Sequence, residues 1–132
     1  MKLSTRGKYG LYAMHYLAKQ EGKGPQPLQN IAQIGVPKQY LEQLLGNLRR
    51  AGLVNTVRGA KGGYEIAKAP SEITILNIID AMEGPIELSE CALDNNCCER
   101  ANDCAARRVW IRATERINRE LDAIKLSDML EK

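Results

Sequence analysis

The feature that most constrains the fold is a change in the spacing of apolar residues at Gly52. Before it, apolar residues recur three to four positions apart, as in α-helices. After it come the strand-like residues 53–57, a basic run with three glycines at 58–63, and the strand-like residues 64–68. This order predicts a mainly α-helical chain with one small β-hairpin, whose tip carries Arg58 and Lys61.

Three helices are predicted before the hairpin. Ser4 or Thr5 can cap the first helix, which ends near Gly22. A short second helix over about residues 28–34 is followed by a turn at Gly35, and a third helix begins at Pro37 and stops at Gly52. Two helices joined by a tight turn and followed by a hairpin predict a winged helix-turn-helix domain. The first helix carries Tyr9, Leu11, Tyr12, Tyr16 and Leu17.

A glycine-rich phosphate loop of a nucleotide-binding enzyme is the competing interpretation of the hairpin tip. The glycines at 59, 62 and 63 lead into a strand and not a helix, and no Gly-Lys-Ser/Thr follows them. The sequence therefore predicts a protein that is not an enzyme.

In a winged helix-turn-helix protein, the third helix enters the major groove of DNA with its N-terminal residues at the base edges. Amide, ammonium and carboxylate side chains at this end can read bases, and the cations of the helix end and the wing can bind phosphate or the minor groove. Arg49 and its neighbour Arg50 have an alternative role as solvated charges that favour the helix dipole. The predicted DNA-binding residues are Lys38, Gln39, Tyr40, Glu42, Gln43, Arg49, Arg58, Gly59 and Lys61.

The distribution of charge supports double-stranded DNA as the partner. Residues 1–68 contain 11 Lys/Arg and three acidic residues, a net charge of +8, whereas residues 69–132 contain eight Lys/Arg and 13 acidic residues, a net charge of −5. A basic half joined to an acidic half indicates a polyanion-binding domain next to a sensing or pairing domain. A solvated basic face without a partner is the alternative.

All four cysteines, Cys91, Cys97, Cys98 and Cys104, lie within one polar stretch of 14 residues. The opening residues lack the apolar core of a signal peptide, and no apolar run is long enough to span a bilayer, so we expect a cytoplasmic protein without a membrane role. In a reducing compartment, clustered thiolates favour a soft metal or an iron-sulfur cluster over disulfides.

Two helices are predicted around the cysteines. The first begins at Thr74 and ends at Gly84, and the second follows Cys104 and carries Trp110, Ile117 and Ile124 at intervals of seven. Such a stripe favours pairing with the same helix of a second subunit, a homodimer; the alternative is that it covers its own domain. We therefore expect a winged helix-turn-helix domain with a supporting helix over 1–84, a cysteine-rich loop over 85–104, and a dimerisation helix with a short final helix over 105–132.

The chain resembles the family of bacterial transcription regulators that includes IscR, NsrR and CymR. The resemblance is carried by residues 40–45, 48–54 and 57–64, which look like the recognition helix and wing, and extends to residues 1–10 and 73–85. It implies a homodimeric winged-helix regulator whose long helices cross at the dimer interface and whose cysteine loop, when present, binds an iron-sulfur cluster. CymR-like members lack these cysteines, so their mode of sensing is disfavoured.

The cysteine loop is most similar to the IscR type, which reads Cys-x5-Cys-x5-Cys with a histidine three residues further on. Five residues separate Cys91 from Cys97 and five separate Cys98 from Cys104, so either Cys97 or Cys98 can be the middle ligand. Arg107 stands where the histidine is expected. The candidates for the fourth ligand are the spare cysteine, Asp94, Glu99, Asp103 and, least favoured, His15.

The resemblance therefore implies an iron-sulfur-sensing repressor of iron-sulfur assembly genes; a 2Fe-2S cluster is favoured and 4Fe-4S stays open. A nitric-oxide or thiol-redox sensor of the same family is one alternative, since Arg100 would favour the thiolate of a nearby cysteine. An iron-sulfur carrier that does not bind DNA is an alternative of another class. Zinc ranks lower, because the loop contains no Cys-x2-Cys knuckle.

Overall fold

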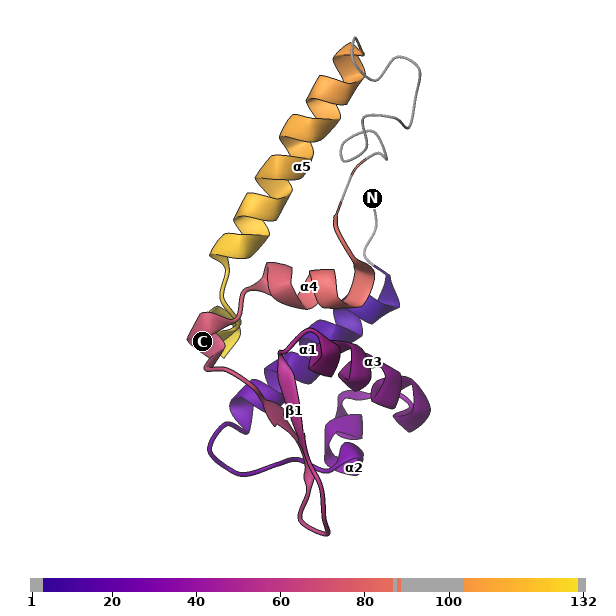
Figure 1. Cartoon of the computed structure of the whole chain (residues 1–132), viewed down its shortest axis with the longest axis vertical. Helices are drawn as coiled ribbons and strands as arrows, with labels where there is room; N and C mark the ends of the chain where they lie inside the picture. The colour runs from indigo at the N-terminus through magenta and orange to yellow at the C-terminus, as the bar shows by residue number, and fades with distance from the viewer. Residues whose placement is uncertain (1–3, 87, 89–103, 131–132) are drawn as a thin grey trace.

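The computed structural model describes residues 4–86, 88 and 104–130 (Figure 1). The described chain is mainly helical with one two-stranded antiparallel sheet, as the sequence predicted. Its elements are α1 (Thr5–Lys19), α2 (Leu28–Ile31), η1 (Ala32–Ile34), α3 (Lys38–Arg50), β1 (Val54–Val57), β2 (Gly63–Ile66), η2 (Pro70–Glu72), α4 (Ile75–Glu83), α5 (Ala105–Ala123) and η4 (Leu126–Leu130), where η denotes a 3-10 helix.

The helix predicted over residues 28–34 divides into one turn of α-helix, α2, and a 3-10 turn, η1. Gly35 then adopts a left-handed conformation with φ of +94°, which glycine tolerates because it has no Cβ. Pro37 precedes α3 as its N-cap. This sharp turn sets the angle between α2 and α3 and completes the helix-turn-helix.

The wing is the hairpin of β1 and β2, which pair from Val54 opposite Ile66 to Val57 opposite Gly63. Its base is held by the segment before α2: the N–H of Gln26 donates to the carbonyl of Tyr64 and the N–H of Tyr64 donates to the carbonyl of Gln26, both at 2.8 Å. The wing is therefore tied to the segment between α1 and α2.

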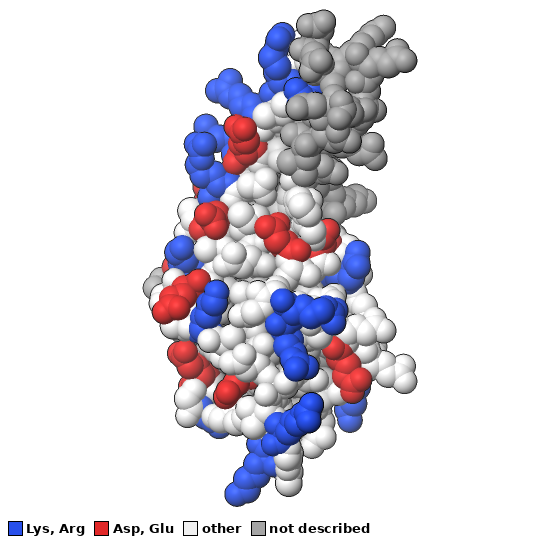
Figure 2. Space-filling model, in the orientation of Figure 1, with Lys and Arg blue, Asp and Glu red and all other residues white. Residues whose placement is uncertain are grey.

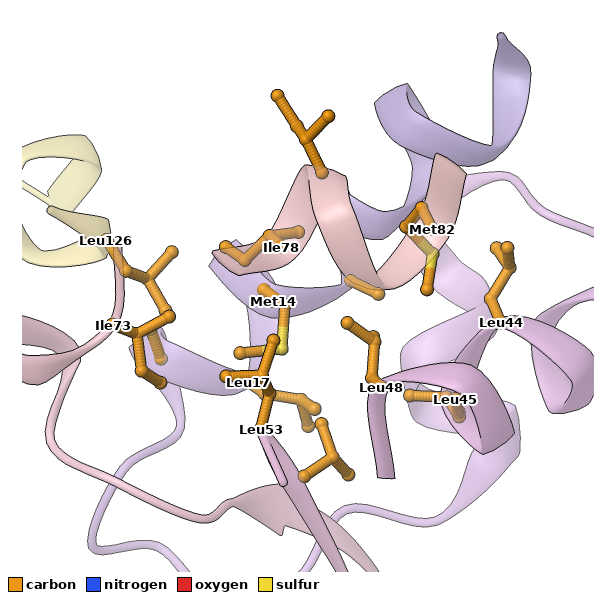
Figure 3. Close-up of a cluster of buried hydrophobic side chains, with 14 of the residues drawn as sticks. Met14, Leu17, Leu44, Leu45, Leu48, Leu53, Ile73, Ile78, Met82 and Leu126 are labelled. Carbon is orange, nitrogen blue, oxygen red and sulfur yellow. The ribbon is translucent and has the colours of Figure 1, made fainter. Parts of the chain in front are cut away.

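One hydrophobic core joins α1, α3, α4 and the start of the wing (Figure 3). Met14 of α1, Leu48 of α3 and Ile78 of α4 are fully buried in it. Leu126, after α5, is also fully buried and closes the core from the C-terminal side. Helix α3 is thus fixed on its inner side by the same core that holds the other helices.

The buried face of α1 is formed mainly by small residues and not by its tyrosines. Gly7, Gly10 and Ala13 are buried, whereas Tyr12 keeps 51% of its surface exposed. A Cβ at Gly10 would lie only 2.6 Å from Cγ of Met82 on α4, so a larger residue there would require the Met82 side chain to move. The contact between helices, which the apolar spacing alone does not reveal, decides which face of α1 turns inward.

The start of α4 carries the predicted cap. Thr74 Oγ1 accepts from the N–H of Asn77 at 3.0 Å, and the N–H of Thr74 donates to Asn77 Oδ1 at 2.9 Å, which is a reciprocal capping box. Backbone bonds from Ile75 to Ile124 and from Leu126 to Ile73 attach the end of α5 at the same place. The cap therefore also marks the junction of α4 with the C-terminal part of the chain.

Helix α5 projects from the body at the end opposite the tip of the wing (Figure 1). Its second half packs on the core through Ile117, Leu121 and Ile124. In its first half, Val109 is 58% and Trp110 39% exposed. The predicted stripe is therefore divided, with Ile117 and Ile124 covering their own domain and Trp110 left at the surface. Within the part of the chain that is described, we find no helix long and apolar enough to span a membrane.

Candidate nucleic-acid interface

The outer side of α3 is polar along its whole length. Because an α-helix has 3.6 residues per turn, positions three, four and seven apart share a face. Leu41, Leu44, Leu45 and Leu48 form the buried face. The predicted DNA-binding residues Lys38, Gln39, Glu42, Gln43 and Arg49 are all exposed on the remaining surface.

Tyr40, also predicted to bind DNA, differs from the other predicted residues because it is half-buried. Its ring packs edge-on against Tyr9 of α1, with ring centroids 5.9 Å apart and planes inclined by 80°. Edge-to-face pairs of this kind stabilise a contact beyond the area they bury. Tyr40 thus joins the N-terminal end of α3 to α1, and its remaining exposed edge stays beside the polar face.

The tip of the wing presents the other predicted residues. Arg58, Gly59 and Lys61 are all exposed, and Gly59 has a φ of +112°. A Cβ at Gly59 would have no described atom within 4 Å beyond its chain neighbours. Figure 2 shows basic side chains at the lower end of the molecule, where the hairpin ends in Figure 1. The wing therefore carries cationic side chains and an open backbone out from the body.

Arg6, in the first turn of α1, lies beside α3 although the sequence analysis did not select it. With Gln43, Asn47 and Arg50 it lines a surface hollow of about 370 Å³, to which Glu42 also contributes. The only signal in the sequence is a basic residue near the chain start. Its neighbourhood depends on how α1 crosses α3, which helical spacing does not specify.

Of the four cysteines, only Cys104 belongs to the described residues. Cys91, Cys97 and Cys98, with Asp94, Glu99 and Asp103, lie outside them. Cys104 is a free, half-buried cysteine at the N-cap of α5, and its side chain makes no capping hydrogen bond. Of the four predicted cysteine ligands, the structure therefore describes only Cys104, whose thiol is not used in capping the helix.

No group of three or more His, Cys, Asp or Glu side chains suited to a metal ion occurs among residues 4–86, 88 and 104–130. His15 lies on α1 in a shallow depression lined by Tyr12, Tyr16, Lys19 and Ile34, with neither a cysteine nor an acidic residue among these. Its surroundings offer no partner ligand in the described chain.

The segment that leads toward the cysteines runs along α5. The N–H of Leu88 donates to the buried hydroxyl of Thr114 at 3.3 Å, and the side-chain amide of Asn118 donates to the carbonyl of Ile86 at 3.5 Å. These bonds place Ile86 and Leu88 against the middle of α5.

An electrostatic conflict lies at the contact of α4 with α5. Partial burial of the Asp80 carboxyl, together with the nearby carboxylate of Asp122, raises the pKa of Asp80 above its ordinary value of 3.8. The ionised form of Asp80 is therefore less favourable in the folded chain than in the unfolded one.

A helix-turn-helix joined to a two-stranded wing, on a core that leaves the outer side of the second helix polar, defines the class of winged-helix transcriptional regulators. The sequence profile of Rrf2, described as an iron-dependent transcriptional regulator, matches residues 3–132. The chain therefore belongs to the Rrf2 family, whose members matched here are transcriptional regulators and not enzymes.

The similar proteins include both CymR and IscR. The HTH-type transcriptional regulator CymR of Bacillus subtilis is 43% identical over 98% of this chain and 89% of its own length. Its solved structure, titled as that of the global cysteine regulator, gives a TM-score of 0.79 at 42% identity and covers 98% of this chain and 95% of the other.

The HTH-type transcriptional regulator IscR of Aliivibrio salmonicida is 35% identical over 98% of this chain and 77% of its own length. The structure of T. potens IscR gives a TM-score of 0.79 at 40% identity over 98% of this chain and 86% of the other. Identity is higher to CymR than to these two IscR proteins, so overall similarity does not select the IscR type.

Proposed function

We propose that this chain is a transcriptional repressor that binds operator DNA through α3 and the wing. The observation that carries the proposal is the outer side of α3, where Gln39, Glu42 and Gln43 are exposed while the leucines opposite them are buried. A polar helix face fixed on a rigid core can enter the major groove without disturbing the fold.

The side chains of α3 suit direct reading of bases. Gln39 and Gln43 can pair with adenine edges, Lys38 with guanine, and Glu42 can accept from the amine of cytosine. Arg49 near the helix end, and Arg58 and Lys61 at the tip of the wing, supply cations for backbone phosphates or the minor groove. Gly59 lets the wing backbone approach the duplex closely, since its surroundings are open.

We further propose that an iron-sulfur cluster at the cysteines regulates this binding, with 2Fe-2S favoured and 4Fe-4S as the alternative. Cys91, Cys104 and either Cys97 or Cys98 would hold the cluster. The support is the concentration of all cysteines in residues 91–104, the free thiol of Cys104, and the family description as iron-dependent. A bound cluster would supply a centre that responds to iron supply, oxidation or nitric oxide.

Thiol-redox sensing without a cluster is the second candidate. It is favoured by Arg107 at the position where an IscR-type loop has histidine. Under this alternative, two of the clustered thiols would form a disulfide on oxidation. The two candidates differ in whether iron and sulfide accompany the purified protein.

The proposal includes a cytoplasmic homodimer with α5 in the dimer interface. Exposed Val109 and Trp110 on the projecting half of α5 support it, since such apolar side chains favour burial against a partner. A dimer also suits a DNA site with two half-sites. Cluster occupancy can then change operator affinity only by favouring one arrangement of the two α3 helices. In allosteric proteins, such coupling typically changes the affinity for the second ligand by a factor of about 5–150.

Salt dependence of duplex binding tests the DNA-binding function. We expect the logarithm of the binding constant to fall steeply with the logarithm of salt concentration, and Arg58→Ala to reduce the magnitude of that slope by about 0.9 per protomer. Arg119→Ala, which removes the same charge from an exposed position on α5, serves as the control and should leave the slope unchanged. Weak, sequence-indifferent binding by the intact chain would instead favour the iron-sulfur carrier.

Anaerobic purification with visible absorption spectra and iron and sulfide analysis tests the cluster. We expect a coloured protein that contains iron and sulfide, and loss of both in Cys104→Ser. Separate Cys97→Ser and Cys98→Ser variants identify which neighbour is a ligand. A colourless, iron-free protein whose operator affinity responds to oxidation of thiols would replace the cluster by the second candidate.

A further inference from the structure

The hollow beside α3 has an arginine from each of two helices. Arg6 comes from the first turn of α1 and Arg50 from the last turn of α3, and both side chains are exposed. The polar side chains of Gln43 and Asn47 also line it. Two guanidinium groups around one concave surface present a geometry suited to an anion with several oxygens.

Arg50 is directed toward this hollow by its own helix. A Cβ at Gly46 would lie 3.5 Å from Nη1 of Arg50, so the guanidinium folds back over the position where Gly46 has no side chain. It also donates to Oδ1 of Asn47. A glycine inside a helix weakens it, and here it leaves room for a cation over the outer face of α3.

The first turn of α1, which carries Arg6, contacts a carboxylate from another helix. The N–H of Ser4, the N-cap of α1, donates to Oε1 of Glu83 at 2.5 Å. Gly7 is buried against the same carboxyl group: a Cβ there would lie 3.2–3.4 Å from its atoms. Glu83, the last residue of α4, thus holds the first turn of α1, where a negative charge also favours the helix dipole.

We propose that Arg6 is a further DNA contact, binding with Arg50 a backbone phosphate at the rim of the groove that α3 enters, and that Glu83 is its positioning residue. This inference rests on the proposed DNA-binding function and extends its interface from α3 and the wing to α1. The occupant is a duplex phosphate because the hollow adjoins the base-reading face of α3, and the groove walls are lined by phosphates.

The competing role for Arg6 is orientation of Glu42, which lines the same hollow. No ion pair within 4 Å joins the two, both of which the structure describes. The two roles predict different effects on DNA recognition. A phosphate contact is lost equally on all sequences, whereas a residue acting through Glu42 would change the preference for particular bases.

The test uses the full chain, a duplex selected with it from a random library, and an unrelated duplex of the same length and base composition. We expect Arg6→Ala to weaken binding to both duplexes by the same factor and to reduce the magnitude of the salt slope by about 0.9 per protomer. Arg6→Lys should retain the slope. Lys19→Ala, an equal change of charge at the other end of α1, is the matched control and should change neither.

A double-mutant cycle tests the role of Glu83. We expect Glu83→Ala to weaken binding and lower the slope in the otherwise unchanged chain, and to add nothing in the Arg6→Ala background, because both changes remove one contact. Additive losses would make Glu83 a purely structural residue and overturn its positioning role. Unfolding midpoints of all variants, measured in parallel, identify any loss of folded protein.

Failure of this inference can be distinguished from failure of the proposed function. If the unchanged chain binds duplex with a steep salt slope and Arg6→Ala keeps that slope, Arg6 is not a phosphate contact but the function stands. If Arg6→Ala weakens binding to the selected duplex alone, Arg6 acts by orienting Glu42 and does not bind a phosphate. If the unchanged chain itself lacks salt-dependent binding, the proposed function fails.

Discussion

Replacing Gly63 by alanine should destabilise the chain by separating the wing from the segment before α2. Gly63 has a φ of +150°, and a Cβ there would lie 2.2 Å from the carbonyl oxygen of Gln26 and 2.8 Å from the nitrogen of Pro27. These neighbours are backbone atoms, so no rotation of a side chain can relieve the overlap. Accommodation requires the Gln26 segment to move away from Tyr64.

The magnitude follows from what that movement breaks. The two backbone hydrogen bonds between Gln26 and Tyr64, both 2.8 Å, contribute about 0.5–1.5 kcal/mol each, and their loss costs about 1–3 kcal/mol. The positive φ adds about 1–3 kcal/mol for any residue with a Cβ. Gly59→Ala is the matched control, because its φ is +112° but no described atom lies within 4 Å of the added carbon. Gly59→Ala therefore includes the cost of a positive φ but not the overlap with backbone atoms of another segment.

Urea unfolding followed by far-ultraviolet circular dichroism measures both variants. With a slope of about 2 kcal/mol per molar urea, the midpoint of Gly63→Ala should lie about 0.5–1.5 M below that of Gly59→Ala. Equal midpoints for the two variants would refute the reasoning, since they would mean that the backbone of Gln26 yields without loss of its bonds to Tyr64.

Three further predictions concern α4 and α5. Thr74→Ala removes the hydroxyl that accepts from Asn77 and should lower the unfolding free energy by about 0.5–2 kcal/mol in urea titrations; a change within error would show that the capping box contributes nothing. Because the folded-state pKa of Asp80 is raised, the stability linked to it is fully present below about pH 4 and is lost as pH rises through the folded value. Asp80→Asn should therefore raise the midpoint of thermal unfolding at pH 7 but not at pH 3. An equal rise at the two pH values would exclude destabilisation by the ionised Asp80 carboxylate. Trp110→Glu should leave the circular dichroism spectrum unchanged but convert the proposed dimer to monomer in sedimentation experiments, whereas an intact dimer would place the interface elsewhere.

Local chemistry made much of the architecture predictable. The apolar spacing of α3, the glycines of the wing and the cap at Thr74 each specify a structure through contacts within a few residues. The exposure of the α3 residues that we propose to read DNA follows from the same spacing, because once the leucines turn inward the remaining side chains must face outward. The family likewise followed from short motifs, and the match over residues 3–132 bears it out.

The errors and omissions concern contacts between distant segments. The tyrosines of α1 gave no indication that Gly10 and Ala13 would form its buried face, because that choice depends on the approach of Met82 from α4. Similarly, the stripe on α5 was continuous in sequence but is divided by the core, which covers Ile117 and leaves Trp110 at the surface.

The sequence by itself therefore determined the main helices and the hairpin with their approximate bounds, and it showed that all four cysteines lie in one stretch, since each of these depends on residue type and short-range spacing. Only the tertiary structure decided that Glu83 holds the first turn of α1, that Arg6 and Arg50 share one hollow, and that Gln26 anchors the wing. The physical reason is that these contacts join residues from different elements. Their proximity depends on how the helices pack around a common core, and no repeating pattern along the chain encodes that arrangement.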